Sequence, residues 1–250
     1  MATSYKLTID NGTLFKDAMH YQSVVGALQY VVITHLDIAF TVNRVCQCMQ
    51  FSCDVHLQSV KRILKYLHAT VDFGLRFAAS SRLSLTGFAD TNWGFDADDR
   101  RSTSGYCIYF AGNLVSWGSH KQHVVPRSTA EAEYRSVACA AAEIAWLESL
   151  LSELRVTVHG KFVLWCDNSS AVAVCANPIL HLKFKHVELD LFFVREIVAA
   201  GKLSVREVHA FEQVADVLTK SLSAHMFLKH RQRLFVSQIL DKFVDSQVEE

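Results

Sequence analysis

Apolar residues recur at two different spacings along the chain, and the change of spacing divides it into two parts. From Tyr21 to Leu67 they recur three and four residues apart, which predicts three helices, with Asp37 and Asp54 at the starts of the second and third. This pattern stops near residue 80, and apolar runs of strand length follow. We therefore expect a small helical segment over residues 1–80 and a different kind of domain after it.

Strands and helices alternate in the second part. Strands are predicted at residues 83–90, 105–110, 114–117, 162–166 and 203–208. Helices are predicted from Ser128 to Leu154, from Ser169 or Ser170 to Asn177, and over residues 187–200, 212–220 and 224–250. This order predicts an α/β domain over residues 81–225, with a mixed five-stranded sheet flanked by helices, and a C-terminal helical tail over residues 226–250.

The longest predicted helix begins within the stretch Arg127-Ser-Thr-Ala-Glu-Ala-Glu-Tyr-Arg135. Ser128 and Glu131 have the spacing of a capping box, in which a hydroxyl and a carboxylate accept hydrogen bonds from N–H groups at the helix start. Glu133 lies about 200° further around the helix, next to the first residue of the apolar stripe. If Glu131 caps the helix, Glu133 is free to face inward. The stripe comprises Tyr134, Val137, Ala141, Ile144, Leu147, Leu151 and Leu154.

Composition narrows the class of protein. The 250 residues are 50% hydrophobic and 20% charged, which is the balance of a folded protein. Lys and Arg together number 25, as do Asp and Glu, so nucleic-acid binding would need a local basic patch. The row Lys61, Arg62 and Lys65 is one candidate. A solvated helix face is its simpler explanation, and contact with a nucleic-acid backbone is the alternative.

Cysteines and apolar runs bear on location. Seven cysteines are scattered without a CxxC pair or zinc-site spacing, which favours reduced thiols and an intracellular protein. The polar N-terminus lacks the apolar core of a secretory signal. The apolar stretch from Val24 to Val42 is interrupted by Gln29, His35 and Asp37, so we interpret it as core helices and expect no membrane contact.

Four carboxylates lie near the ends of predicted elements. Asp90 and Asp167 lie at strand ends, Glu133 near the start of the long helix, and Asp216 near the start of a late one. In α/β sheets, ligands gather at the carboxyl ends of central strands. Taken singly, each residue has a simpler interpretation, as a turn former for the two strand-end Asp residues and as a solvated charge for the other two. Spacing alone does not establish that the four converge.

Convergence of these carboxylates would restrict the chemistry. Four carboxylates close together repel one another and are costly to desolvate unless a cation compensates them. An all-oxygen set favours a hard ion such as Mg²⁺ or Mn²⁺. Two such ions about 3.5–4 Å apart activate a water and stabilise the leaving oxygen in phosphodiester hydrolysis.

Short motifs follow one another from about residue 20 to residue 225. The first part contains Tyr21-Gln-Ser-Val-Val-Gly-Ala-Leu-Gln-Tyr30, Asp37-Ile-Ala-Phe40 and Val60-Lys-Arg-Ile-Leu-Lys-Tyr-Leu67. The second contains Phe88-Ala-Asp-Thr-Asn-Trp93, Asp99-Arg-Arg-Ser-Thr-Ser-Gly-Tyr106, Ser116-Trp117 with Lys121-Gln122, Ser128-Thr-Ala-Glu-Ala-Glu-Tyr134, Leu164-Trp-Cys-Asp-Asn168, Lys185-His186 with Val194-Arg-Glu196, and Glu212-Gln-Val-Ala-Asp-Val-Leu-Thr-Lys220. In this order they resemble the C-terminal part of a Ty1/copia-type retrotransposon Pol polyprotein.

The resemblance implies a fold, a site and an activity. The domain would be ribonuclease H-like, and the helical segment would be the C-terminal end of the reverse transcriptase region. The family's metal-binding set falls by motif on Asp90, Glu133, Asp167 and Asp216, which would bind two Mg²⁺ ions, with Mn²⁺ as a substitute. The implied activity is hydrolysis of the RNA strand of an RNA–DNA hybrid, with recognition of 2′-OH groups across a wide minor groove.

The resemblance also implies limits and partners. The catalytic Tyr-x-Asp-Asp motif of the polymerase is absent, since the one Asp-Asp pair is Asp98-Asp99, in an acidic loop with Asp96. We therefore expect no polymerase activity. The expected partners are an RNA–DNA hybrid and the missing reverse transcriptase region. The expected location is intracellular, either cytoplasmic in a retroelement particle or nuclear.

Several positions depart from the family pattern. They are His35-Leu36, Ala89, Asn92, Pro126, Phe184 and Leu191-Phe192. None replaces a predicted metal ligand. They nevertheless leave open the alternative of a catalytically inactive, degenerate retroelement relic that at most binds nucleic acid. A further alternative is a helical segment whose apolar faces are exposed because they once packed on the polymerase.

Three histidines are candidates for lesser roles. His209 precedes the last helix of the domain, where a His assists product release in other ribonucleases H, although a plain loop histidine is the simpler interpretation. We interpret His181 and His186 as structural, because no Cys or third ligand accompanies them.

Overall fold

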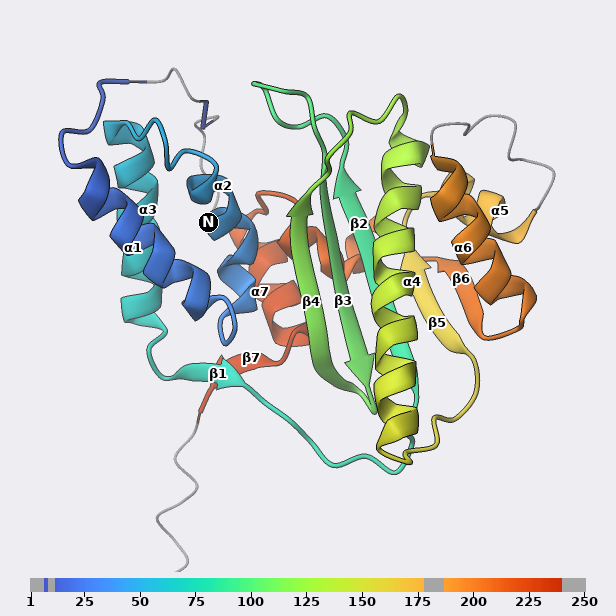
Figure 1. Ribbon diagram of the computed structural model, residues 1–250. Helices are drawn as coiled ribbons and strands as arrows, with labels where there is room; N and C mark the ends of the chain where they lie inside the picture. Colours follow the sequence, from blue (N-terminus) through green and yellow to red (C-terminus); the bar gives the residue numbers. More distant parts are fainter. Residues whose placement is uncertain (1–6, 9–11, 178–186, 240–250) are drawn as a thin grey trace, which may run out of the picture.

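The computed structural model describes residues 7–8, 12–177 and 187–239. A cluster of helices lies beside a twisted sheet that carries helices on both faces (Figure 1). Within the described residues, no helix is both long and apolar enough to cross a lipid bilayer. His181, Phe184 and His186 lie outside the described residues, so their predicted roles stay predictions.

The three helices predicted for the helical segment are present. They are α1 (Ala18–Val31), α2 (Ala39–Cys46), which the short 3₁₀ turn η1 (Leu36–Ile38) precedes, and α3 (Asp54–Ala69). Their apolar faces enclose a small core that includes Tyr21, Val25, Val42, Val60 and Ile63. Lys61, Arg62 and Lys65 are exposed on α3, as a solvated helix face requires.

The five predicted strands form one mixed sheet, which confirms the predicted fold class. They are β2 (Leu85–Asn92), β3 (Thr103–Phe110), β4 (Asn113–Lys121), β5 (Phe162–Cys166) and β6 (Leu203–Glu207). Their order across the sheet is β4-β3-β2-β5-β6. The pairs β2–β3 and β3–β4 are antiparallel, whereas β2–β5 and β5–β6 are parallel. The carboxyl ends of β2 and β5 therefore lie at the same edge.

Three helices cover one face of the sheet. They are α4 (Thr129–Glu153), α5 (Ser169–Ala176) and α6 (Glu188–Ala199). The predicted apolar stripe of α4 packs on this face, where Tyr134 and Ile144 share a core with Leu85 and Leu164. The stripe ends earlier than predicted, because Leu154 is exposed.

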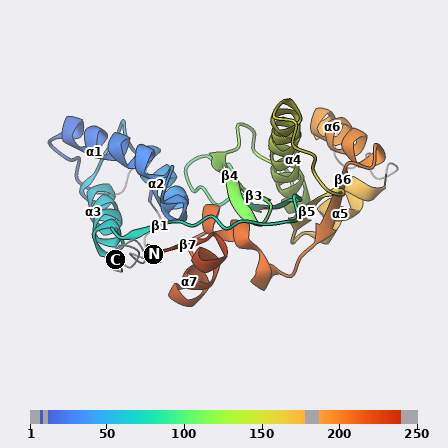
Figure 2. The ribbon, with the colours of Figure 1, turned by 90° about the horizontal axis from the view of Figure 1, so that it is seen from below.

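The opposite face is covered by C-terminal elements (Figure 2). They are the 3₁₀ turns η4 (Ala210–Glu212) and η5 (Val214–Leu218) and the helix α7 (Ala224–Arg233). The single helix predicted over residues 212–220 is therefore wrong. Gln213 has an extended backbone, and its side-chain Oε1 accepts a hydrogen bond from the Ala215 N–H at 3.3 Å, which ends one turn and begins the next.

The predicted tail helix is also shorter than expected. It ends at Arg233, and Phe235 takes a positive φ of 59° that reverses the chain. Residues of β7 (Val236–Gln238) then pair antiparallel with β1 (Phe73–Leu75). The prediction of helix over 226–250 thus fails from residue 234 to residue 239, and residues 240–250 lie outside the described part.

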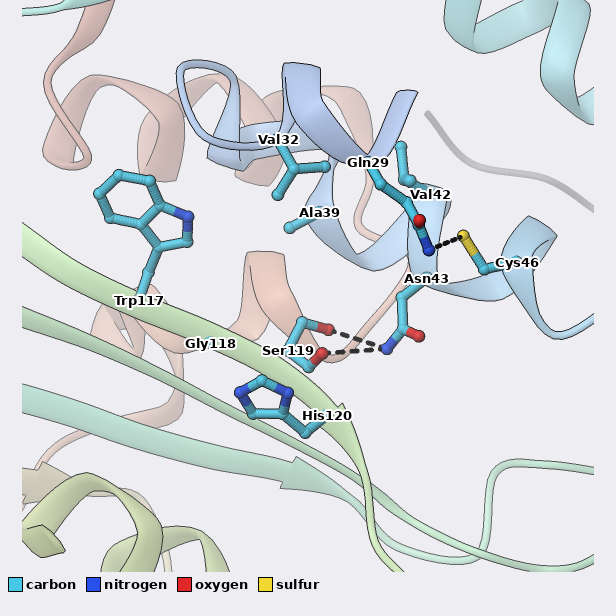
Figure 3. Close-up of a pocket in the computed structure, with 10 residues that line it drawn as sticks. All are labelled: Gln29, Val32, Ala39, Val42, Asn43, Cys46, Trp117, Gly118, Ser119 and His120. Atoms are coloured by element: carbon cyan, nitrogen blue, oxygen red, sulfur yellow. Dashed lines mark hydrogen bonds between the residues drawn. The ribbon is translucent and has the colours of Figure 1, made fainter. Parts of the chain in front are cut away.

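Polar contacts connect the helical segment to the edge strand β4. Asn43 Nδ2 donates a hydrogen bond to Ser119 O at 3.1 Å. Arg44 lies 2.9 Å from Asp96, and Lys121 lies 2.6 Å from the same carboxylate, so this part of the acidic loop is neutralised. A cavity of about 280 Å³ lies between α1, α2 and β4 next to these contacts (Figure 3).

Candidate functional site

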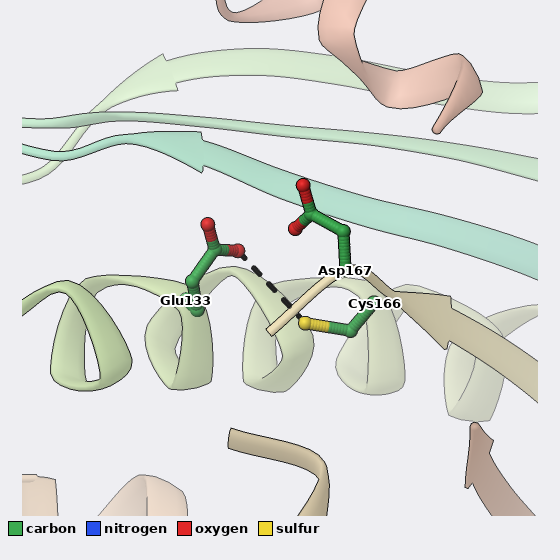
Figure 4. Close-up of side chains that lie close together, drawn as sticks. All are labelled: Glu133, Cys166 and Asp167. Atoms are coloured by element: carbon green, nitrogen blue, oxygen red, sulfur yellow. Dashed lines mark hydrogen bonds between the residues drawn. The ribbon is translucent and has the colours of Figure 1, made fainter. Parts of the chain in front are cut away.

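The four predicted carboxylates converge on one edge of the sheet. Oxygens of Asp90, Asp167 and Asp216 all lie within 4.8 Å of one another. Glu133 and Asp167 form a second group of the same width together with Cys166 Sγ (Figure 4). Asp167 belongs to both groups and links them into one cluster.

The parallel pairing of β2 and β5 brings the first two carboxylates together. Phe88 of β2 is opposite Trp165 of β5. Asp90 and Asp167 each come two residues later. Because side chains two residues apart in a strand point to the same face, the two carboxylates arrive at the same level and on the same side.

The start of α4 places Glu133 and turns Glu131 away. Ser128 Oγ accepts a hydrogen bond from the Glu131 N–H at 3.2 Å, as a helix cap should. The Glu131 carboxylate accepts from the Arg127 N–H at 2.8 Å, one residue before the expected N–H of Ser128, and lies 3.2 Å from Arg135. Glu131 is thus engaged at the helix start, whereas Glu133 is buried against the sheet, 3.9 Å from Cys166 Sγ (Figure 4).

Burial and the charges of neighbouring carboxylates make Glu133, Asp90 and Asp167 hold protons more tightly than usual. Burial, together with the charges of Asp90 and Asp167, raises the pKa of Glu133 to about 10. Burial raises the pKa of Asp90 to about 7, against the opposing effect of Lys220. Burial also raises the pKa of Asp167. Raised pKa values of this kind are typical of a cluster of negative charge. A divalent cation would compensate this charge, and the carboxylate oxygens of the cluster suit a hard ion.

Two residues just after η5 contact the cluster, and the sequence motifs predicted no role for either of them. Lys220 Nζ lies 2.9 Å from Asp90 Oδ1 and 2.8 Å from Asp216 Oδ1. The Thr219 hydroxyl donates a short hydrogen bond to Asp90 Oδ2. Burial lowers the pKa of Lys220, but the two carboxylates raise it by more, so the ammonium stays charged. Its position four residues after Asp216 is the signal that could have identified it, because that spacing brings side chains together on a helical turn.

Hydrogen bonds fix η5 against β2. Gln213 Nε2 donates to Ala89 O at 2.9 Å, and Asn92 Nδ2 donates to Thr219 O at 2.6 Å. Asn92 Oδ1 also accepts from the Thr103 N–H at 2.5 Å. Both ends of the Asn92 amide are thus engaged, one with β3 and the other with the chain that carries Asp216.

A close approach of backbone segments completes the arrangement. A Cβ atom on Gly105 of β3 would lie 2.6 Å from Thr219 Cγ2 and 2.9 Å from Leu218 Cβ, so only glycine allows η5 to lie this near the sheet. On the opposite side, Ser136 Oγ of α4 donates to Asp90 O at 2.7 Å. Both neighbours of β2 thus restrict the position of Asp90.

His209 lies away from this hydrogen-bond network. It is exposed, and its Nδ1 accepts a hydrogen bond from the Phe211 N–H at 3.2 Å, which caps η4. This contact agrees with the loop-histidine interpretation and does not test a part in product release.

Comparison with known proteins assigns the chain to a family. No protein-family model matches it. The chain is 42% identical over 239 residues to the retrovirus-related Pol polyprotein from transposon RE2 of Arabidopsis thaliana. This match covers 96% of the chain and 16% of that protein. The match to the corresponding polyprotein from transposon TNT 1-94 of Nicotiana tabacum is 35% identical and covers 83% of the chain and 16% of that protein. The chain belongs to the Pol polyproteins of Ty1/copia-type retrotransposons.

This Pol segment thus spans 16% of the length of the curated relatives it matches. Among solved structures, the foamy viral protease-reverse transcriptase in complex with an RNA/DNA hybrid superimposes with a TM-score of 0.50, at 10% identity, over 81% of the chain and 26% of that protein. At this identity the likeness shows the fold alone. The Pol segment contains a ribonuclease H-like domain, as the sequence motifs predicted.

Proposed function

We propose that this Pol segment is a metal-dependent endonuclease that hydrolyses the RNA strand of RNA–DNA hybrids. The observation that carries the proposal is the convergence of Asp90, Glu133, Asp167 and Asp216 at one edge of a ribonuclease H-like sheet. The four residues lie in or next to four separate elements. Burying them together is costly unless they bind a cation.

The donor set fits Mg²⁺, with Mn²⁺ as a substitute. Asp90, Glu133, Asp167 and Asp216 would hold two ions through carboxylate oxygens, the ligands that these ions prefer. When bound, such ions activate a water at neutral pH and stabilise the charge that develops on the leaving oxygen. Cys166 is the soft donor that the described residues bring next to the cluster, and burial raises the pKa of its thiol, which keeps it protonated and a poor ligand.

The remaining contacts of the site hold the carboxylates in place. Thr219 and Ser136 fix the two ends of Asp90, its carboxylate and its carbonyl group. Gln213 and Asn92 fix the turn that carries Asp216. Full burial of Asp90 limits competition from bulk water, so its charge acts strongly on whatever binds beside it.

The division of the chain is part of the proposal. Residues 81–225 would form the nuclease domain, residues 1–80 the end of the reverse transcriptase region, and residues 226–250 the tail. The reverse transcriptase region of such polyproteins would be the natural partner of the helical segment, which exposes Leu14, Met19, Tyr30 and Ile33. The substrate would be an RNA–DNA hybrid, the nucleic acid named for the complex of the structurally similar foamy viral protein.

Incubation of the purified chain with a hybrid whose RNA strand is labelled tests this proposal. Short RNA products are expected with Mg²⁺ or Mn²⁺ and none with EDTA, and duplex DNA of the same sequence should stay intact. A chain that folds and binds Mn²⁺ yet leaves the hybrid uncut would favour the inactive relic.

A further inference from the structure

We propose that the ammonium group of Lys220 occupies, in the metal-free protein, the place between Asp90 and Asp216 where one of the two divalent ions would bind. Metal binding at this pair then requires the lysine to leave. The inference rests on the proposed function, because it takes these carboxylates to be metal ligands.

The contacts of Lys220 are those of a bridging cation. Its Nζ lies 2.9 Å from Asp90 Oδ1 and 2.8 Å from Asp216 Oδ1, so it is shared between two carboxylates from different elements. Asp90 and Asp216 also belong, with Asp167, to the group of carboxylates whose oxygens lie within 4.8 Å of one another. One positive charge placed there offsets part of the repulsion among the acidic residues.

An ammonium group and a divalent ion exclude each other at this position. The ammonium already contacts one carboxylate oxygen of Asp90 and one of Asp216, and two cations about 3 Å apart in a buried site repel strongly. Among the described interactions, the Lys220 ammonium forms hydrogen bonds with Asp90 and Asp216 and none with Glu133 or Asp167, whose pKa values its charge lowers only from a distance. We therefore expect the free protein to bind one ion readily and the second only weakly.

The lysine has a path out of the site. Its side chain is 36% exposed, whereas the Asp90 side chain is fully buried. Lysine carries its charge on a flexible stem of four carbons, and outside the cluster it can pair with a phosphate of a bound nucleic acid. Substrate would then favour the second ion by attracting the lysine away, which couples full metal loading to nucleic-acid binding.

A purely structural ion pair would behave differently from a competing cation. Removing a structural lysine would lower stability and leave metal affinity unchanged or weaker. Removing a competing cation would lower stability without metal but strengthen metal binding, because the two carboxylates become available and uncompensated. The sign of the change in metal affinity therefore separates the two roles.

Titration of Mn²⁺ by calorimetry and by electron paramagnetic resonance, without nucleic acid, tests the inference. The wild-type chain should bind one ion tightly. Lys220→Met should bind two ions, or bind the weaker one about tenfold more tightly, and its melting temperature should rise more with Mn²⁺ than that of the wild type. Lys220→Arg keeps the charge and should behave as the wild type does.

The matched control is Lys202→Met, since Lys202 pairs with Glu148 on the surface at 3.3 Å. It should leave both ion count and affinity unchanged. Equal or weaker Mn²⁺ binding by Lys220→Met would overturn the inference. If Lys220→Met does not fold in EDTA, Lys220→Gln is judged by the same criterion. Because substrate is absent, the result stands apart from the cleavage assay, and either can fail alone.

Discussion

Glu131 and Glu133 are two residues apart in α4, yet their carboxylates face different surroundings. The Glu131 carboxylate accepts a hydrogen bond from the Arg127 N–H at 2.8 Å, outside the acidic cluster. The Glu133 carboxylate is buried beside Asp167, with Cys166 Sγ at 3.9 Å. Two residues of the same type therefore stabilise different things, one the start of a helix and the other, as we propose, a metal ion.

The pair predicts opposite effects of the same substitution. Glu133→Gln should leave the stability of the chain in EDTA unchanged or raise it. The substitution puts an uncharged amide of the same shape in the place of a buried carboxyl group, whose pKa is already raised by burial. It should abolish the rise in melting temperature that Mn²⁺ causes in the wild type. Thermal unfolding with and without Mn²⁺ measures both effects.

Glu131→Gln is the matched control. It weakens the contacts with the Arg127 N–H and with Arg135, and should cost about 1 kcal/mol of unfolding free energy. The rise with Mn²⁺ should persist. If Glu131→Gln removed that rise and Glu133→Gln kept it, the two glutamates would have been assigned the wrong way round.

Stability should depend on pH in a direction set by the acidic cluster. Burial raises the pKa of Asp90 from its ordinary value to about 7 and that of Glu133 to about 10. The folded chain thus binds protons more tightly than the unfolded one, so this contribution to stability is present at low pH and is lost as pH rises through the native pKa values. In EDTA the melting temperature should fall between pH 5 and pH 8.

Mn²⁺ should reverse this pH dependence, since the ion binds the deprotonated carboxylates and competes with protons. Asp90→Asn should flatten the EDTA profile, because it removes one of the titrating groups. A wild-type profile in EDTA that rises over the same interval would show that the cluster does not dominate stability there.

Gly105 should be intolerant of a side chain. In Gly105→Ala the new methyl group would meet Thr219 Cγ2 at 2.6 Å and push η5, with Asp216, away from the sheet. Displacement of a site residue by about 1 Å can cost about 100-fold in rate, and we expect hybrid cleavage to fall by that order. Gly26→Ala is the control, because a methyl group there meets nothing within 4 Å and alanine favours a helix. Equal cleavage by both variants would contradict the packing argument.

The end of the described chain should contribute to the core. Leu234, just before β7, is fully buried beside Leu36 and Val217. Leu234→Ala should cost about 2–5 kcal/mol of unfolding free energy, as measured by chemical denaturation. Leu228→Ala, at a position 48% exposed in α7, should cost far less. A cost for Leu234→Ala as small as that for Leu228→Ala would contradict the burial of Leu234 in the core.

The sheet could be predicted from sequence because each strand carries its own local pattern. The run Phe162–Cys166, for example, is apolar throughout and lies in the sheet between β2 and β6. The tail could not be predicted, since β7 is three residues long and exists only through pairing with β1, which is far away in sequence. No local pattern distinguishes such a strand from the last turns of a helix.

In the candidate site, too, local features could be predicted from the sequence, whereas contacts between distant residues could not. Glu133 could be singled out locally, because capping engages Glu131 and helical geometry turns the next glutamate elsewhere. The contact of Lys220 with Asp90 joins residues 130 positions apart and follows from the way η5 packs on β2. Convergence of the four carboxylates likewise came from the family resemblance and from the fold, and not from spacing.

The role of the acidic cluster is tested most directly by the rate of RNA-strand cleavage in a labelled hybrid. The wild-type chain is compared with Asp90→Asn and with Asp72→Asn, which changes an exposed aspartate near β1. With Mg²⁺, the wild type and Asp72→Asn should cleave the RNA strand and Asp90→Asn should give no detectable cleavage, with all three chains folded. Equal cleavage by Asp90→Asn and the wild type, or no cleavage by a folded wild-type chain, would contradict this role of the cluster.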